Sequence, residues 1–174
     1  NPELMGDIAG GVAQMAPGAA GDVAGAMVEA NPDGAADMAA TIAETVPGAA
    51  GAVAGAIAEA DPTLAADAAS AMMEANPAAA AQAAAGMANA APEVAGDVAG
   101  AMMEVAMAPD FAAEFAENAA AANPDLSFED LETLAGNFAG NAVGAIAQGM
   151  ATGDPDIAAD MAGVMMDVAM DNPD

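Results

Sequence analysis

The stretch PGAAGDVAGAMVEAN, residues 17–31, recurs with variations along most of this chain. A proline opens each copy, and the prolines follow one another at an unbroken step of fifteen residues: Pro2, Pro17, Pro32, Pro47, Pro62, Pro77 and Pro92. Each proline is followed by a run of residues that helices accept, mostly Ala, Met, Gly and Val. A fixed period of this kind is the sequence signature of a stacked repeat protein. We number the positions of each unit from 1, its proline, to 15.

Each unit predicts one short helix. The prolines are often preceded by a residue that caps helices through a side-chain oxygen, namely Asn1, Asn31, Asp61, Asn76, Asn123, Asp154 and Asn172. Proline suits the first helical position, because its missing N–H has no partner there. A helix of about twelve residues spans roughly 18 Å and is marginal in water by itself. We therefore expect packing between units to hold the helices.

The helix faces indicate how the units pack. Positions 6 and 13 are mostly acidic, and with position 2 they form one narrow stripe. Positions 3, 7, 11 and 14 form the opposite, apolar stripe, which includes Leu4, Ile8, Val12, Val23 and Met27. A helix that is polar over so little of its circumference needs neighbours on most other sides. Alternate units differ in their acids, so the full repeat is a hairpin of thirty residues. We predict an all-α, solenoid-like stack of short antiparallel helices.

Glycines recur on one side of these helices. Positions 5 and 9 hold the pairs Gly21 and Gly25, Gly51 and Gly55, and Gly96 and Gly100. A second line follows later, with Gly136, Gly140 and Gly144. Helices with small residues at such spacing can approach each other closely. We expect these glycines to set the packing distance between neighbouring helices.

The period slips after Pro92, since the next prolines are Pro109, Pro124 and Pro155. Ser127 and Asp130 fit a capping box, which predicts a longer helix near residues 128–150. The chain is therefore expected to form one domain, 1–174. Its parts are regular repeats at 1–108, an irregular segment with all four phenylalanines at 109–154, and a terminal repeat at 155–174.

Composition argues against many functions. The chain has no Lys, Arg, His, Cys, Trp or Tyr, and its 27 acids give a formal charge of −27. Without cations it cannot neutralise phosphates, which argues against nucleic-acid binding and against anionic membrane surfaces. The uncharged run 133–153 is about long enough to span a bilayer, but it carries polar amides and has no flanking cation.

Zinc and haem sites of the usual kind need His or Cys, and so do most catalytic nucleophile pairs. No differentiated pair of acids suggests acid–base catalysis. We predict that the chain is not an enzyme.

Carboxylates are the only metal-binding groups in the chain, and oxygen ligands suit Ca²⁺. Two local clusters are the candidates: Asp125, Glu129 and Asp130, and Asp154, Asp156 and Asp160. Neither cluster has the spacing of an EF-hand loop. The alternative is that the acids form a solvated face that keeps an apolar protein soluble. No other cofactor is expected.

The sequence favours a structural protein that assembles with itself into an extracellular or cell-surface filament, sheath or matrix. The first and last units are as apolar as the interior ones, and uncapped solenoid ends can stack. Assembly should strengthen with Ca²⁺ or falling pH, because both reduce repulsion among the acids. One alternative is an acidic module that binds Ca²⁺ or templates a mineral. A second alternative, from the regular Ala-rich surface, is an ice-binding protein.

Overall fold

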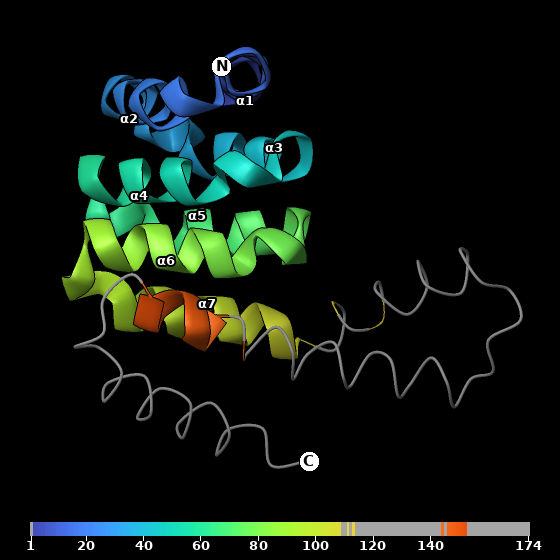
Figure 1. Ribbon diagram of the computed structural model, residues 1–174, viewed down its shortest axis with the longest axis vertical. Coiled ribbons are helices and arrows are strands. Elements are labelled where there is room, and N and C mark those ends of the chain that lie inside the picture. The colour runs from blue at the N-terminus through green and yellow to red at the C-terminus, as the bar shows by residue number, and fades with distance from the viewer. Residues whose placement is uncertain (1, 109–110, 112, 114–143, 145, 153–174) are drawn as a thin grey trace, which may run out of the picture.

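A computed structural model describes residues 2–108, 111, 113, 144 and 146–152, and the described part of the chain has no strand (Figure 1). The predicted all-α stack of short helices is confirmed. Over residues 2–107, seven α-helices follow one another, joined by six 3₁₀ turns. The helices are α1 (Pro2–Met15), α2 (Ala20–Ala30), α3 (Ala35–Thr45), α4 (Ala50–Ala60), α5 (Ala65–Ala75), α6 (Ala80–Ala90) and α7 (Ala95–Met107). The turns are η1 (Pro17–Ala19), η2 (Pro32–Gly34), η3 (Pro47–Ala49), η4 (Pro62–Leu64), η5 (Pro77–Ala79) and η6 (Pro92–Val94).

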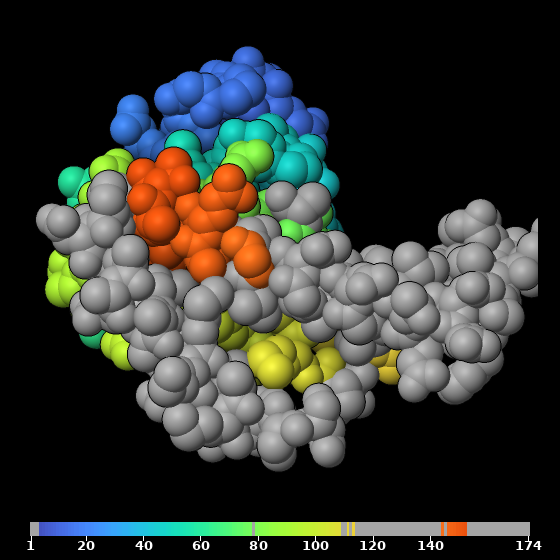
Figure 2. Space-filling model, turned by 60° about the horizontal axis from the view of Figure 1, so that its bottom comes forward, coloured from blue at the N-terminus to red at the C-terminus, as the bar shows by residue number. Residues whose placement is uncertain are grey.

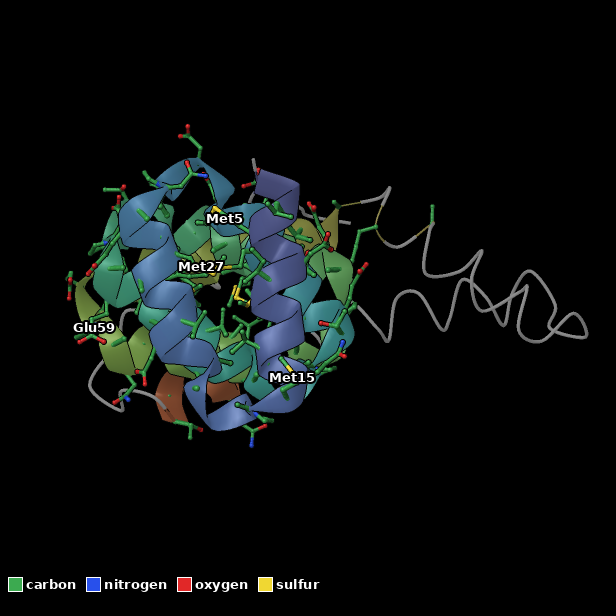
Figure 3. All side chains as sticks on the ribbon, turned by 90° about the horizontal axis from the view of Figure 1, so that it is seen from above. Met5, Met15, Met27 and Glu59 are labelled. Carbon is green, nitrogen blue, oxygen red and sulfur yellow. The ribbon has the colours of Figure 1, made fainter. Side chains whose placement is uncertain are left out.

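The helices stand in two columns (Figure 1). One column holds α1, α3, α5 and α7, and the other holds α2, α4 and α6. Each helix therefore packs most extensively against a helix two units away, thirty residues along the chain. Seen from above, α1 and α2 lie side by side at one end of the stack, with Met5 and Met27 between them (Figure 3).

The corners between units explain the period. Before each of the six turns, one residue is extended, with φ between −154° and −139° and ψ between 67° and 98°. Proline disfavours the helical region for the residue before it, so the helix ends there. At Val46 the N–H donates to the Ile42 carbonyl at 2.8 Å, and the carbonyl accepts from the Ala49 N–H at 2.9 Å. One extended residue thus turns the chain with both of its backbone groups paired. No described residue needs a positive φ.

The residues before the prolines cap less often than predicted. Asp61 does cap, because its side chain accepts from the Thr63 N–H at 3.0 Å. The prediction is wrong for Asn31, whose side chain makes no cap hydrogen bond. Its Nδ2 instead lies 3.0 Å from Met5 Sδ in the adjacent column. Asn76 Nδ2 donates to the Ala43 carbonyl at 2.9 Å. An amide carries a donor that a carboxylate lacks, so these two side chains link neighbouring helices.

The core is built of small and flexible side chains. Alanines at positions 4 and 8 of most units are buried, and Met fills the wider gaps. The largest fully buried side chains are Met38, Ile42, Ile57, Met72, Met73, Met87, Met102, Met103, Ile146, Met150, Val28 and Val53. Met adapts its shape to irregular spaces. Among the described residues, no polar or charged side chain is buried.

The stack continues beyond the slip in the period. Residues 144 and 146–152 are helical, and Ile146 and Met150 belong to the same core as the seven helices. A Cβ on Gly149 would meet the Ala81 carbonyl of α6, just as a Cβ on Gly86 would meet the Gly51 carbonyl of α4. Ala81 follows Gly51 by thirty residues, whereas Gly149 follows Gly86 by 63. This helical segment therefore takes the next place in the α2–α4–α6 column, after an insertion of 33 residues.

The predicted longer helix is only partly visible. Its described part is helical to Thr152, two residues past the predicted end. Its predicted start, and most of the segment 109–154, lie outside the described residues, as does the terminal repeat 155–174. None of the described helices is long and apolar enough to cross a membrane.

Candidate functional site

The acidic stripe lies on the outside of the stack, as predicted. Every described position 6 is exposed, and so is every described position 13: Asp7, Asp22, Asp37, Ala52, Asp67, Gln82, Asp97, Gln14, Glu29, Glu44, Glu59, Glu74, Asn89 and Glu104. Glu59 points away from the columns into solvent (Figure 3). Because the helices stack in register, these side chains form rows along each column. The rows concentrate negative charge on the two outer faces.

One hollow on this surface holds several acids. It has a volume of about 550 Å³ and lies between α5 and α7. Asp67, Glu74 and Glu104 line it, together with Ser70 and Phe111. Over the described part of the chain, no three acidic side chains stand close enough to hold a metal ion. All three carboxylates of this hollow are exposed.

The candidate calcium ligands cannot be placed. Asp125, Glu129, Asp130, Asp154, Asp156 and Asp160 all lie outside the described residues. The calcium hypothesis therefore stays a prediction.

The glycines of α2 and α4 lie where neighbouring backbones approach. A Cβ on Gly21 would stand 2.9 Å from the Ala52 oxygen, and one on Gly51 would stand 2.8 Å from the Gln82 oxygen. Gly55 is equally close to the Gly86 oxygen, at 2.9 Å, whereas Gly25 makes an ordinary contact at 3.6 Å with Ala56 Cβ. Real Cβ atoms do not come within 3.0 Å of such atoms. A larger residue would thus separate the helices at three of these four positions.

The other predicted glycines differ. Gly96 and Gly144 have nothing within 4 Å of a built Cβ, Gly100 is half-buried in α7, and Gly136 and Gly140 lie outside the described residues. Gly86 and Gly149 also approach a neighbouring backbone closely, although no regular spacing in the sequence marks either of them. Gly86 is position 10 of the unit that begins at Pro77. Gly149 makes the equivalent contact with the preceding helix of the column, so we assign it position 10 as well. That position shows no regular glycine pattern in the sequence, and only the opposing helix reveals its role.

The N-terminal end of the stack exposes apolar side chains. Leu4 is 54% exposed, Ile8 is 50% exposed and Met15 is 83% exposed. The equivalents of Ile8 in α3 and α7 are Met38 and Val98, and both are fully buried. Within the described stack, α3 packs against α1 and α7 packs against α5, the helices that come before them in the column, and α1 is the first helix described. A hollow of about 430 Å³ opens on this end, lined by Leu4, Met5, Ile8, Met27, Ala30 and Asn31.

The described C-terminal end is open as well. Residues 144 and 146–152 lie at the surface in Figure 2, where they are orange. Gly144, Gln148 and Ala151 are exposed, while the residues at the same positions of α4 are half-buried or buried: Gly51, Gly55 and Ala58. The face that α4 turns towards the next helix of its column is therefore exposed on this segment.

Comparison with protein-family models, with curated proteins and with solved structures returns no match for this chain.

Proposed function

We propose that this chain is a structural protein that assembles with itself into a filament, sheath or matrix. One observation carries the proposal: Ile8 is 50% exposed on α1, whereas the residues at the same position of α3, α5 and α7 are fully buried, namely Met38, Ala68 and Val98. A solenoid that stays monomeric needs end units with a polar outer face. The first unit of this chain has no such polar outer face, since it exposes Leu4, Ile8 and Met15.

The remaining features agree with a structural role. The stack repeats one small building unit, a short helix with its 3₁₀ turn, every fifteen residues. The dense negative charge suits a protein that works outside the cell, where divalent cations are plentiful enough to screen it. An extracellular or cell-surface location is part of the proposal.

The experiment compares two double variants that add the same charge. Leu4→Glu with Ile8→Glu places two carboxylates on the open end, where assembly would bury them. Gln14→Glu with Gln82→Glu places two carboxylates on the solvated stripe, where both glutamines are already exposed. Burying an unpaired charge costs several kcal/mol, and about 1.4 kcal/mol changes an equilibrium constant tenfold. The end variant should therefore assemble at least tenfold more weakly than the stripe variant.

Sedimentation velocity over a wide range of concentration, in a buffer with salt, measures the assembly, and electron microscopy shows its form. Circular dichroism checks that both variants keep their helix content. The proposal fails if the unaltered chain remains a monomer at the highest concentration, or if both variants assemble as it does.

A further inference from the structure

We propose that the buried methionines make this stack a redox-sensitive switch: peroxide converts their thioethers to sulfoxides and thereby holds the chain in an opened, unpacked state. Seven methionines carry the inference, and we call them the core methionines. Each is fully buried, with an exposed fraction of 0%: Met38, Met72, Met73, Met87, Met102, Met103 and Met150. The inference concerns the fold of a single chain, so it does not depend on the self-assembly proposed above.

The core methionines recur with the units of the stack. Met72 and Met73 hold positions 11 and 12 of α5, and Met102 and Met103 hold the same two positions of α7, thirty residues further along. Helices α5 and α7 pack against each other in one column. All four side chains belong to one hydrophobic cluster. Oxidation of these thioethers would therefore alter the interior of the stack in successive units.

Oxidation changes what a methionine side chain needs from its surroundings. The thioether sulfur attacks one oxygen of hydrogen peroxide, an S–O bond forms as the O–O bond breaks, and the proton of the transferred oxygen leaves with the second oxygen as water. The sulfur loses two electrons and the peroxide gains them. The product is a polar sulfoxide in place of a flexible apolar group. Its oxygen accepts hydrogen bonds, and a buried acceptor without a donor destabilises the fold.

The described core offers no donor to such an oxygen. No polar or charged side chain is buried among the residues that the structure describes, and the N–H groups inside a helix are bonded to carbonyls of the same helix. Protein interiors are also close-packed, so an added oxygen displaces its neighbours. Each core sulfoxide should therefore lower the folding equilibrium constant roughly tenfold or more.

Met5 and Met15 show the contrast with the core. Met5 Sδ lies 3.0 Å from Asn31 Nδ2, so an amide donor already stands beside this sulfur. Met15 is 83% exposed at the end of α1, where Figure 3 shows it, and water can solvate its sulfoxide. Oxidation at these two residues should leave the fold intact. The environment of each sulfur, rather than the number of sulfoxides, thus decides the effect.

Burial also controls when the core methionines react. Peroxide reaches a fully buried sulfur only when the surrounding units open, and repeat stacks open locally because each unit contacts only its neighbours. A reaction that consumes the opened form draws the equilibrium towards it. Methionine sulfoxide reductases, one for each epimer, restore the thioether. Oxidation and reduction would thus set the two states of the switch.

Two leucine variants separate the core methionines from the other described ones. Leucine is close to methionine in volume and has no sulfur. The core variant replaces all seven core methionines, and the control variant replaces the remaining described four: Met5, Met15, Met27 and Met107. Each chain is oxidised with hydrogen peroxide in urea, where every methionine is accessible, and is then returned to buffer. Circular dichroism measures the recovered helix content, and mass spectrometry counts the added oxygens.

The core variant should recover most of its helix content, whereas the unaltered chain and the control variant should recover little. Treatment of the oxidised unaltered chain with both reductases and dithiothreitol should restore its helix. Equal loss of helix in the core variant and the unaltered chain would overturn the inference.

Oxidation of the unaltered chain in buffer without urea decides the matter if the core variant does not fold. Peptide mapping should find Met15 oxidised roughly tenfold faster or more than Met72 and Met102, because only opening exposes the latter two. Helix content should fall in step with the sulfoxides at Met72 and Met102 and not with that at Met15. A chain that keeps its helix content and unfolding midpoint with these two core methionines oxidised would contradict the inference, and so would equal rates at all three residues.

Discussion

At the scale of single residues, glycine has different roles at two positions that lie one turn apart in the same helix. Gly21 and Gly25 both lie on the side of α2 that packs against α4. A Cβ on Gly21 would meet a backbone oxygen at 2.9 Å, and the backbone of a packed helix cannot move without moving its neighbours. A Cβ on Gly25 would make an ordinary contact at 3.6 Å with a methyl group. The same residue type is therefore required at one position and merely tolerated at the other.

This difference predicts opposite effects of one substitution. Gly21→Ala should destabilise the fold by about 1–3 kcal/mol, because the added methyl forces α2 and α4 apart. Gly25→Ala should stabilise it by about 0.5–1 kcal/mol, because alanine favours the helix and meets no obstacle. Urea unfolding followed by circular dichroism measures both free energies. Equal effects of the two substitutions would show that the close approach at Gly21 does not limit the packing.

At the scale of helices and corners, much of the fold follows from local rules. Proline acts on the residue before it, and that effect does not depend on distant parts of the chain. The fifteen-residue step was therefore enough to predict where each helix ends, and the position of the acids was enough to predict which side faces solvent.

The features that the sequence did not reveal depend on which helix lies opposite. The amide of Asn31 reaches Met5, and that of Asn76 reaches Ala43, because the columns bring them together. The sequence did not predict that the column resumes at Gly149, for a second reason. The register places the start of that unit at Gly140, where the chain has no proline to mark it. The ends of the stack were predicted to be open, but only the burial of Met38 and Val98 identifies what α1 leaves uncovered.

The repeated corner predicts that a whole repeat can be removed. Deleting residues 47–76 joins Val46 to Pro77, so the same extended residue and proline turn form the new corner. Gly21 would then face Gln82 in place of Ala52, as Gly51 does now. The shortened chain should keep its helix content per residue and unfold cooperatively, at a lower midpoint, because stability in a stack sums over neighbouring units.

A deletion that breaks the register provides the control. Removing residues 47–72 leaves a fragment of α5 before Pro77 and shifts the faces of the helices that follow. This chain should lose helix content and aggregate. If thermal unfolding by circular dichroism showed both deletions to be equally stable, the corner would not be the unit of the fold.

At the scale of the whole molecule, charge opposes the compact state. The formal charge is −27, and the chain has no cation that could pair with any acid. The described stripe residues are exposed and stand in rows along each column, so the folded stack holds like charges closer together than an unfolded chain does. Salt weakens such repulsion, since the screening length falls from about 30 Å at 0.01 M to about 10 Å at 0.1 M ionic strength. The same repulsion acts between copies, which ties assembly to ionic conditions.

The chain should therefore be more stable in salt. Raising NaCl from about 0.01 M to about 0.1 M or above should stabilise it on the order of 2 kcal/mol, which corresponds to roughly 4–8 °C in the unfolding midpoint for a chain of this length. Glu29→Gln with Glu59→Gln removes two charges from one row of the stripe, so its midpoint should depend less on salt. Differential scanning calorimetry on dilute samples measures both midpoints.

A comparison of CaCl₂ with NaCl at matched ionic strength separates screening from calcium binding. An equal rise of the unfolding midpoint in the two salts indicates screening alone. A larger rise in CaCl₂ that the double variant Asp125→Asn with Asp130→Asn abolishes indicates a calcium site. A midpoint that does not change with NaCl would contradict the claim that repulsion among these acids limits the stability of the stack.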